Sequence, residues 1–213
     1  MGLEEYRRSV SESKRASILR AARAAFLKDG FSRAAVAEIA NMADVSTATL
    51  YKHFDSKEEL FAAVAKDAAM SVGDYSHLLD PDTAPRDAFL TLSRAYLATQ
   101  FENHVNDLMR IIIAEVPSHP ELAREMMDLI VGRRHRSLQN VLDRLVDQGL
   151  LRPHDTTLSA KLASGMIKEL FVWPALFNAD FRLPEDTEAK IDMAANVFLA
   201  RYGIDTTGQG MTG

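Results

Sequence analysis

The chain has 213 residues, of which 47% are hydrophobic and 26% are charged, and it contains no cysteine. This composition predicts a soluble globular protein of one or two domains, and it excludes disulfides, thiol catalysis and cysteine-based metal sites. The net charge of −5 is uneven, because residues 1–66 hold 11 Lys and Arg against 9 Asp and Glu while residues 67–213 hold 14 against 21, so a mildly basic N-terminal part joins an acidic body.

The N-terminal residues are polar. Residues 1–17 carry charges where an export signal would have an apolar run, and no later segment has the length and hydropathy of a membrane span. With the absence of cysteine, this favours a cytoplasmic location and no membrane partner. Residues 1–13 are expected to form a polar tail, either solvated or joined to a first helix over residues 14–28. Gly30 suits a left-handed cap at the end of that helix.

Residues 36–61, VAEIANMADVSTATLYKHFDSKEELF, predict two short helices joined by a tight turn and followed by a third. The first helix ends before Asp44. Ser46 is a suitable N-cap for the second helix, in which Leu50 and Phe54 share the face that points back at the first. This is the layout of a helix-turn-helix DNA reader.

The opposite face of the second helix carries hydroxyls, a phenol and a cation, which suit phosphate oxygens and base edges in a major groove. Ser56 and Glu59 predict a capping box that starts the next helix at Lys57, and the positive N-terminal end of that helix favours a phosphate. The candidate DNA-binding residues are Ser46, Thr47, Ala48, Thr49, Tyr51, Lys52, His53 and Lys57.

At these residues the chain resembles the TetR family of transcriptional regulators. The matching segments are ILRAARAAFLKDGF at 18–31, VAEIANMADVS, TATLYKHF and SKEEL. The resemblance implies an N-terminal three-helix DNA-binding domain, a larger helical domain that binds a small molecule, and a two-fold dimer. We accordingly expect domains at residues 1–56 and 57–213. It also implies that Tyr51, His53 and Lys57 contact mainly the DNA backbone.

Several positions depart from the family pattern. Ala34 and Ala35 stand where Thr is frequent, which removes a helix cap of about 1 kcal/mol. Asp44 replaces the usual Gly of the turn, where the backbone is left-handed, a geometry that Asp tolerates better than most residues. Thr47 and Ala48 replace Lys and Gly, so the operator sequence cannot be inferred from relatives.

The rest of the chain shows helical periodicity only, so the expected fold class is all-α, with about nine helices. Residues 74–85 read as a linker. The later helices are predicted over 57–72, 86–102, 105–116, 121–147, 157–178 and 185–202, with interruptions near Gly132 and Pro174. The segment MRIIIAEVPSHPELAREM at 109–126 resembles the C-terminal domain of the AefR-like branch of the family.

A ligand-responsive regulator needs a mostly apolar site with a few polar groups in its larger domain. Each candidate taken alone is better explained by core packing, whereas the set supports a ligand site. The candidates are Phe89, Tyr96, Phe101, His104, Met109, Ile112, Met127, Met166, Phe171 and Trp173.

The last two long helices are the predicted dimer surface, paired as a four-helix bundle across a two-fold axis. Their small residues permit close approach and their apolar residues serve as anchors, although these residues can also fold back on their own domain. The residues concerned are Ala160, Leu162, Ala163, Ser164, Gly165, Ile167, Leu170, Phe177, Ile191 and Phe198.

No catalytic chemistry is visible. The motifs Walker A, GxSxG and HExxH are absent, and the six histidines do not pair at ligand spacing on one helix. We therefore expect no enzyme activity, no cofactor and no metal. Arg133, Arg134 and Arg136 are expected on a solvated face, with an acidic ligand or partner as the alternative.

These features predict a homodimeric TetR-type repressor that binds double-stranded operator DNA and is released by a small apolar or amphipathic ligand. A regulator that binds DNA without a ligand is one alternative, and a helical enzyme that binds a small molecule is another. Repressors and activators bind DNA in the same way, so the sequence does not separate them.

Overall fold

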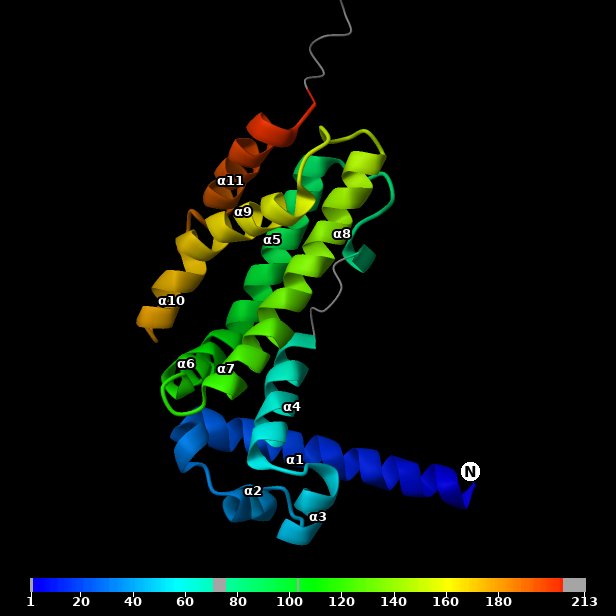
Figure 1. Ribbon diagram of the computed structural model, residues 1–213, viewed down its shortest axis with the longest axis vertical. Helices are drawn as coiled ribbons and strands as arrows, with labels where there is room; N and C mark the ends of the chain where they lie inside the picture. Colours follow the sequence, from blue (N-terminus) through cyan, green and yellow to red (C-terminus); the bar gives the residue numbers. More distant parts are fainter. Residues whose placement is uncertain (1, 71–75, 103, 205–213) are drawn as a thin grey trace, which may run out of the picture. The chain divides into compact units, whose positions relative to one another are not determined.

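The computed structural model describes residues 2–70, 76–102 and 104–204. Within these ranges the fold consists of α-helices, two short π-helical segments and one 3-10 turn, with no β-strand (Figure 1). One isolated antiparallel bridge joins Leu151 to Gly203. The predicted all-α fold is confirmed, and none of the described helices has the length and hydropathy to span a bilayer.

The chain divides into two compact units. The first comprises residues 1–70 and 107–130, and the second comprises residues 71–106 and 131–213. The helices of the first unit are α1 (Leu3–Arg33), α2 (Val36–Met42), α3 (Thr47–His53), α4 (Lys57–Met70), most of α6 (Val105–Glu115) and α7 (Pro120–Met127). Those of the second are η1 (Ser76–Leu78), α5 (Pro85–Glu102), α8 (Arg133–Asp147), α9 (Thr156–Ile167), α10 (Trp173–Phe177) and α11 (Thr187–Tyr202).

The first helix begins earlier than its apolar pattern predicts. Residues 3–13 continue α1 toward the N-terminus, so of the two expected arrangements the joined one is found (Figure 1). No Gly or Pro lies within residues 3–29 to break the helix. Gly30 has φ 77° and ψ 173°, so the regular helix ends there in a conformation that only glycine adopts readily, although it is not the predicted left-handed cap.

Three phenylalanines form the centre of the first unit. Phe26, Phe31 and Phe61 are each at most 2% exposed. The ring centroids of Phe26 and Phe61 are 5.0 Å apart in an edge arrangement, and those of Phe31 and Phe61 are 5.2 Å apart. Such aromatic pairs contribute about 0.5–1.5 kcal/mol beyond the area that they bury. This core fixes α4 on α1, and α2 also packs on α1.

The second unit contains two apolar clusters. One gathers Leu92 of α5, Leu145 of α8 and Phe198 of α11 among others. The other is built around Ile167 at the end of α9 and Phe171 just after it. Apolar residues of α5, α8, α9 and α11 therefore form the core of the second unit.

Two predicted long helices are interrupted by π-helical segments. These are η2 (Asp128–Gly132), between α7 and α8, and η3 (Lys168–Val172), between α9 and α10. Pro174 has no N–H to donate and its ring clashes with the carbonyl four residues earlier, so a wider turn just before it relieves the conflict. Gly132 ends the other segment, at the predicted interruption.

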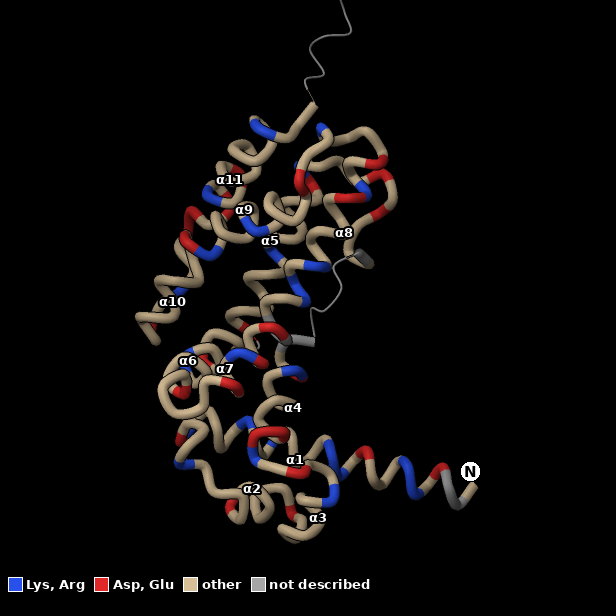
Figure 2. The backbone as a smooth tube through the Cα atoms, in the orientation of Figure 1, with Lys and Arg blue, Asp and Glu red and all other residues tan. Residues whose placement is uncertain are grey.

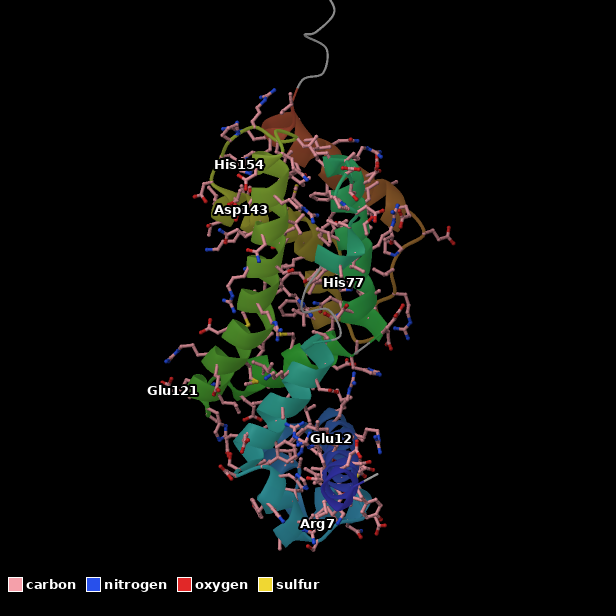
Figure 3. All side chains as sticks on the ribbon, turned by 90° about the vertical axis from the view of Figure 1, so that its right-hand side faces the viewer. Arg7, Glu12, His77, Glu121, Asp143 and His154 are labelled. Atoms are coloured by element: carbon pink, nitrogen blue, oxygen red, sulfur yellow. The ribbon has the colours of Figure 1, made fainter. Side chains whose placement is uncertain are left out.

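Side-chain hydrogen bonds fix the corner between α8 and α9. Asp155 caps α9 by accepting from the N–H of Leu158 at 3.1 Å, and the hydroxyl of Thr156 donates to Asp143 Oδ1 on α8 at 2.5 Å. His154 and Asp143 are labelled in Figure 3. Of the predicted linker 74–85, residues 74 and 75 lie outside the described residues, and α5 begins at its last position.

Candidate nucleic-acid interface

The turn between α2 and α3 is held by backbone geometry. Asp44 has φ 54°, the left-handed conformation predicted for this position. The N–H of Val45 donates to the carbonyl of Ala40 at 3.0 Å. The hydroxyl of Ser17 on α1 donates to the carbonyl of Ala43, also at 3.0 Å. These bonds satisfy the carbonyls at the end of α2 and tie the turn to α1.

Helix α3 is capped and amphipathic. Ser46 Oγ accepts a hydrogen bond from the N–H of Thr49 at 3.1 Å, which confirms Ser46 as the N-cap. Leu50 is 0% exposed and Phe54 is 1% exposed, so the predicted inward face is buried. Helix α2 lacks such a cap, because Ala35 makes no side-chain hydrogen bond at its N-terminus.

The opposite face of α3 is open to solvent. Thr47, Ala48 and Lys52 are exposed, and Tyr51 is 47% exposed. Thr49 is half-buried, and its hydroxyl lies 2.9 Å from Ser46 Oγ. The face therefore presents hydroxyl, phenol and ammonium groups around a small alanine, and the alanine permits close approach of another surface.

Positive charge gathers locally beside α3. The pKa of His53 is lowered, first by burial and then by the charges of Arg15, Lys52 and Lys14, which favours its neutral form. The Arg15 guanidinium lies 4.9 Å from the ring centroid of Phe54. Along the N-terminal half of α1, basic and acidic positions alternate instead of forming a basic stripe (Figure 2).

The start of α4 differs in one detail from the predicted capping box. Ser56 Oγ accepts from the N–H of Glu59 at 3.0 Å, as expected. The Glu59 carboxylate accepts from the N–H of Asp55 at 2.5 Å, one residue before the predicted donor. The chain bends at residues 55–56 and so brings this earlier N–H within reach of the carboxylate. Helix α4 begins at Lys57, as predicted.

Lys57 is anchored by the first unit itself. Its Nζ donates to the carbonyl of Ser32 at 3.0 Å and lies 4.8 Å from the ring centroid of Phe31. Burial lowers the pKa of Lys57, while the carboxylates of Glu58 and Glu115 partly oppose that shift. An ammonium has three donors, so Lys57 retains others that suit a phosphate.

The candidate ligand residues are divided between the two units. Met109, Ile112 and Met127 belong to the first unit. Ile112 is 2% exposed, Met109 is half-buried and Met127 is 42% exposed. Ile112 is therefore part of a core, and Met127 lies largely at the surface.

Five candidates gather in the second unit. Phe89, Tyr96, Phe101 and Met166 are half-buried and pack against the cluster that contains Phe171. This brings together residues of α5, α9 and η3 that are up to 82 positions apart in the sequence. The cluster is the part of the candidate set that tertiary structure assembles.

Two candidates in the second unit lie outside that cluster. Trp173 is 48% exposed, and its ring stacks on Phe177 at 6.1 Å between centroids. His104 is exposed, with a positive φ of 55°. Among the described residues, no group of three or more His, Asp and Glu side chains could hold a metal ion.

Arg134 departs from the expected solvated face. Arg133 and Arg136 are exposed, as predicted, but Arg134 is only 9% exposed. The sequence held a signal for this burial, because Arg134 shares a helical face with Leu138 and Val141, four and seven positions later. A further residue not singled out is Glu115 of α6, which binds the end of α1.

The fold and the exposed face of α3 define a helix-turn-helix DNA-binding protein. Two family profiles match the chain: "Bacterial regulatory proteins, tetR family" over residues 18–64, and "AefR-like transcriptional repressor, C-terminal domain" over residues 87–204. The chain belongs to the TetR family of transcriptional regulators. Proteins of this family bind operators and dimerise, and they are DNA-binding regulators rather than enzymes.

Similar proteins agree with this assignment. A solved TetR-family regulator from Mesorhizobium loti is 30% identical with a TM-score of 0.83, over 91% of this chain and 98% of that one. The flavonoid-responsive regulator FrrA is 27% identical with a TM-score of 0.71, over 90% of this chain and 98% of FrrA. The transposon Tn10 TetC protein of Escherichia coli is 20% identical over 156 residues, 73% of this chain and 77% of TetC.

Proposed function

We propose that this chain is a homodimeric repressor that leaves its operator when a small apolar or amphipathic ligand binds. The observation that carries the DNA-binding part is the Ser46-capped α3, which buries Leu50 and exposes Thr47, Tyr51 and Lys52 on the other side. Thr47 and Thr49 contact base edges, whereas Tyr51, Lys52, His53 and Lys57 contact phosphates.

Exposed apolar side chains support a dimer through the last helices. Phe177 is 85% exposed and Met193 is 67% exposed, which is unfavourable in a monomer. Ile167, Ile191 and Phe198, by contrast, are buried in the clusters of their own unit. The proposed dimer surface therefore consists of Leu158, Leu162, Leu170, Trp173, Phe177, Met193 and Val197.

The proposed ligand site is the half-buried aromatic group on the second apolar cluster. Phe89, Tyr96, Phe101 and Met166 offer a deformable apolar lining. FrrA is a flavonoid-responsive regulator of similar fold at 27% identity, which supports a small-molecule effector here. The ligand shifts the population only if it favours a conformer that fits the operator poorly.

The DNA-binding proposal is tested by selecting duplexes from a random pool with the purified protein and measuring affinity at several salt concentrations. Tyr51→Phe is expected to weaken all bound sequences alike, by about fivefold, because it removes a backbone contact. Thr47→Val is expected to change the preference among bases. Selection of no defined sequence, or a salt-independent affinity, contradicts the proposal.

The ligand part is tested by titrating flavonoids and fatty acids into the complex with the selected operator. Release of labelled DNA by at least one compound, together with a raised melting temperature of the free protein, is the expected result. DNA binding that no compound alters, in a protein whose melting temperature none of them moves, supports instead the ligand-independent regulator.

The dimer surface is tested with the double substitution Leu162→Arg and Phe177→Arg. Analytical ultracentrifugation should show a dimer for the unaltered protein and a monomer for the variant. Met127→Arg is the matched control, since Met127 is also a large exposed apolar residue, at 42%, but lies in the first unit. A dimer that survives the double substitution contradicts the assignment.

A further inference from the structure

Arg134 is a buried cation with two nitrogen atoms that make no hydrogen bond among the described residues. Its side chain on α8 is 9% exposed, and among the described residues its Nε and Nη2 atoms have no hydrogen-bond partner. The guanidinium carbon lies 5.2 Å from the ring centroid of Tyr96, so a cation–π contact replaces only part of the lost hydration. Burial of a charged group without an ionic partner is strongly unfavourable.

A second cation lies close to Arg134. Lys168 of η3 is half-buried, and burial followed by the charge of Arg134 lowers its pKa. Its Nζ lies 3.4 Å from His135 Nε2, which is 3.0 Å from Ser164 Oγ. Burial, then Lys168, Lys161 and Arg134, lower the pKa of His135 to about 4. His135 is therefore neutral near pH 7 and adds no positive charge of its own.

No acid of the described chain balances these two cations. Neither Arg134 nor Lys168 forms an ion pair with a described Asp or Glu, although the chain has ion pairs elsewhere, such as Arg94 with Glu188. The second unit thus contains a buried positive centre. Folding removes water from these cations, and an anion bound there would replace the lost hydration with charge-assisted hydrogen bonds.

Apolar side chains also adjoin this centre. Tyr96, whose ring lies under the Arg134 guanidinium, packs together with Phe101 and Met166 against the cluster of Ile167 and Phe171. Lys168 directly follows Ile167 in the chain. A molecule that reached the cations would therefore also meet aromatic and aliphatic side chains.

We propose that Arg134 and Lys168 form a subsite for the anionic head group, a carboxylate or a phosphate, of an amphipathic effector. The two unused atoms, Nε and Nη2, form one edge of the guanidinium, and that edge can donate two parallel hydrogen bonds to a carboxylate or phosphate. The apolar tail lies along the aromatic side chains. This inference rests on the proposed ligand-responsive function and names the chemical class of its ligand.

The experiment measures binding of four probes of equal chain length to the purified full-length protein by calorimetry. The probes are decanoate, decyl phosphate, neutral decanol and decylammonium. At least one of the two anions should bind more tightly than decanol, and decylammonium should bind least. Comparison of the two anions identifies the preferred head group.

Substitutions assign the effect to the cations. Arg134→Met should weaken binding of the preferred anion by about 10- to 100-fold, because charge-assisted hydrogen bonds are lost, and should leave decanol nearly unchanged. Lys168→Met should weaken the anion by a smaller factor. Arg136→Met is the matched control, since Arg136 lies two positions along the same helix and is exposed.

The melting temperature separates a binding role from a structural role. The unliganded Arg134→Met protein should melt at or above the temperature of the unaltered protein, because an unbalanced buried charge is replaced by an apolar side chain of similar length. A clear fall in the melting temperature shows that Arg134 stabilises the fold without a ligand. That result would overturn the proposal.

Three binding results also overturn it: neither anion binds, decanol binds as tightly as both anions, or Arg134→Met binds the preferred anion like the unaltered protein. The proposed function is examined separately through release of operator DNA. If an anion binds through Arg134 but the operator DNA stays bound, the proposal of ligand-released repression is wrong and the anion subsite stands. If decanol releases operator DNA as well as the anions do, the proposed repressor function stands and the anion subsite is wrong.

Discussion

The carboxylate of Glu115 on α6 holds Ser32 at the end of α1, although 83 positions separate the two residues. The N–H of Ser32 donates to Oε1 at 3.2 Å, and its hydroxyl lies 3.0 and 2.9 Å from the two carboxylate oxygens. His119 Nδ1 lies 3.0 Å from Oε2. Lys57 of α4 binds the carbonyl of the same serine. Ser32 therefore links α1 to both α4 and α6.

The same contacts determine the charge state of Glu115. Burial alone raises the pKa of this carboxyl, but the hydrogen bonds from Ser32 and His119 together outweigh burial and hold the pKa below its ordinary value. Glu115 is 8% exposed, so the bonds are little screened by solvent. The contact between Glu115 and Ser32 therefore stabilises the packing of α6 on the end of α1 at neutral pH.

Glu115→Gln is expected to lower the free energy of unfolding by about 1–2 kcal/mol at pH 7, because a charged acceptor is lost. The folded pKa lies below the unfolded value of about 4.3, so the stabilisation is complete above that pH and disappears as pH falls through the folded pKa. Urea unfolding of the two proteins should therefore converge in acid. Glu121→Gln, in an exposed pair with Arg124, should change little; equal stability of Glu115→Gln and the unaltered protein at pH 7 contradicts this assignment.

Asp44→Gly is expected to stabilise the first unit by about 0.5–1 kcal/mol, because glycine adopts a positive φ without the steric conflict of a Cβ atom. Asp44 is exposed with φ 54°, so little packing is lost. Thermal unfolding measures the change. Asp44→Ala keeps the Cβ and should show no gain; if it stabilises as much as glycine, backbone strain is not the cause.

Lys57→Ala and Lys52→Ala are both expected to weaken operator binding, but only Lys57→Ala is expected to lower the stability of the protein. Both remove a proposed phosphate contact, so each should weaken operator binding and reduce the salt slope by about one. Only Lys57 binds Ser32 and packs on Phe31, so only its loss should lower the melting temperature. Arg124→Ala, an exposed cation on α7, serves as the control. Unchanged DNA affinity of Lys57→Ala refutes its phosphate contact.

His135 is expected to make the protein less stable as pH falls from about 6.5 to 4. Its folded pKa of about 4 lies below the ordinary value of 6.5, so the unfolded chain binds the proton more readily. The stability that depends on neutral His135 is thus complete above pH 6.5 and lost through that window. Melting temperatures at intervals from pH 8 to pH 5 should fall more steeply for the unaltered protein than for His135→Gln. Parallel curves contradict this assignment.

Local chemistry made much of the fold predictable. Helix positions followed from apolar spacing. The cap at Ser46, the positive φ angles of Asp44 and Gly30, and the interruption before Pro174 followed from the backbone preferences of single residues. Each of these depends on neighbours within about one helical turn. The exposed, DNA-binding face of α3 could be predicted from such local information together with the expected burial of Leu50 and Phe54 on the opposite face.

Tertiary structure decided the contacts between distant residues. The sequence indicated neither the pairing of Glu115 with Ser32 nor the attachment of Lys57 to that same residue. It also placed Arg134 with two solvated arginines, whereas packing of α8 against α5 set its guanidinium over Tyr96. The physical reason is that a helical period defines which residues share a face, while the partner of that face depends on the packing of elements far apart in the chain.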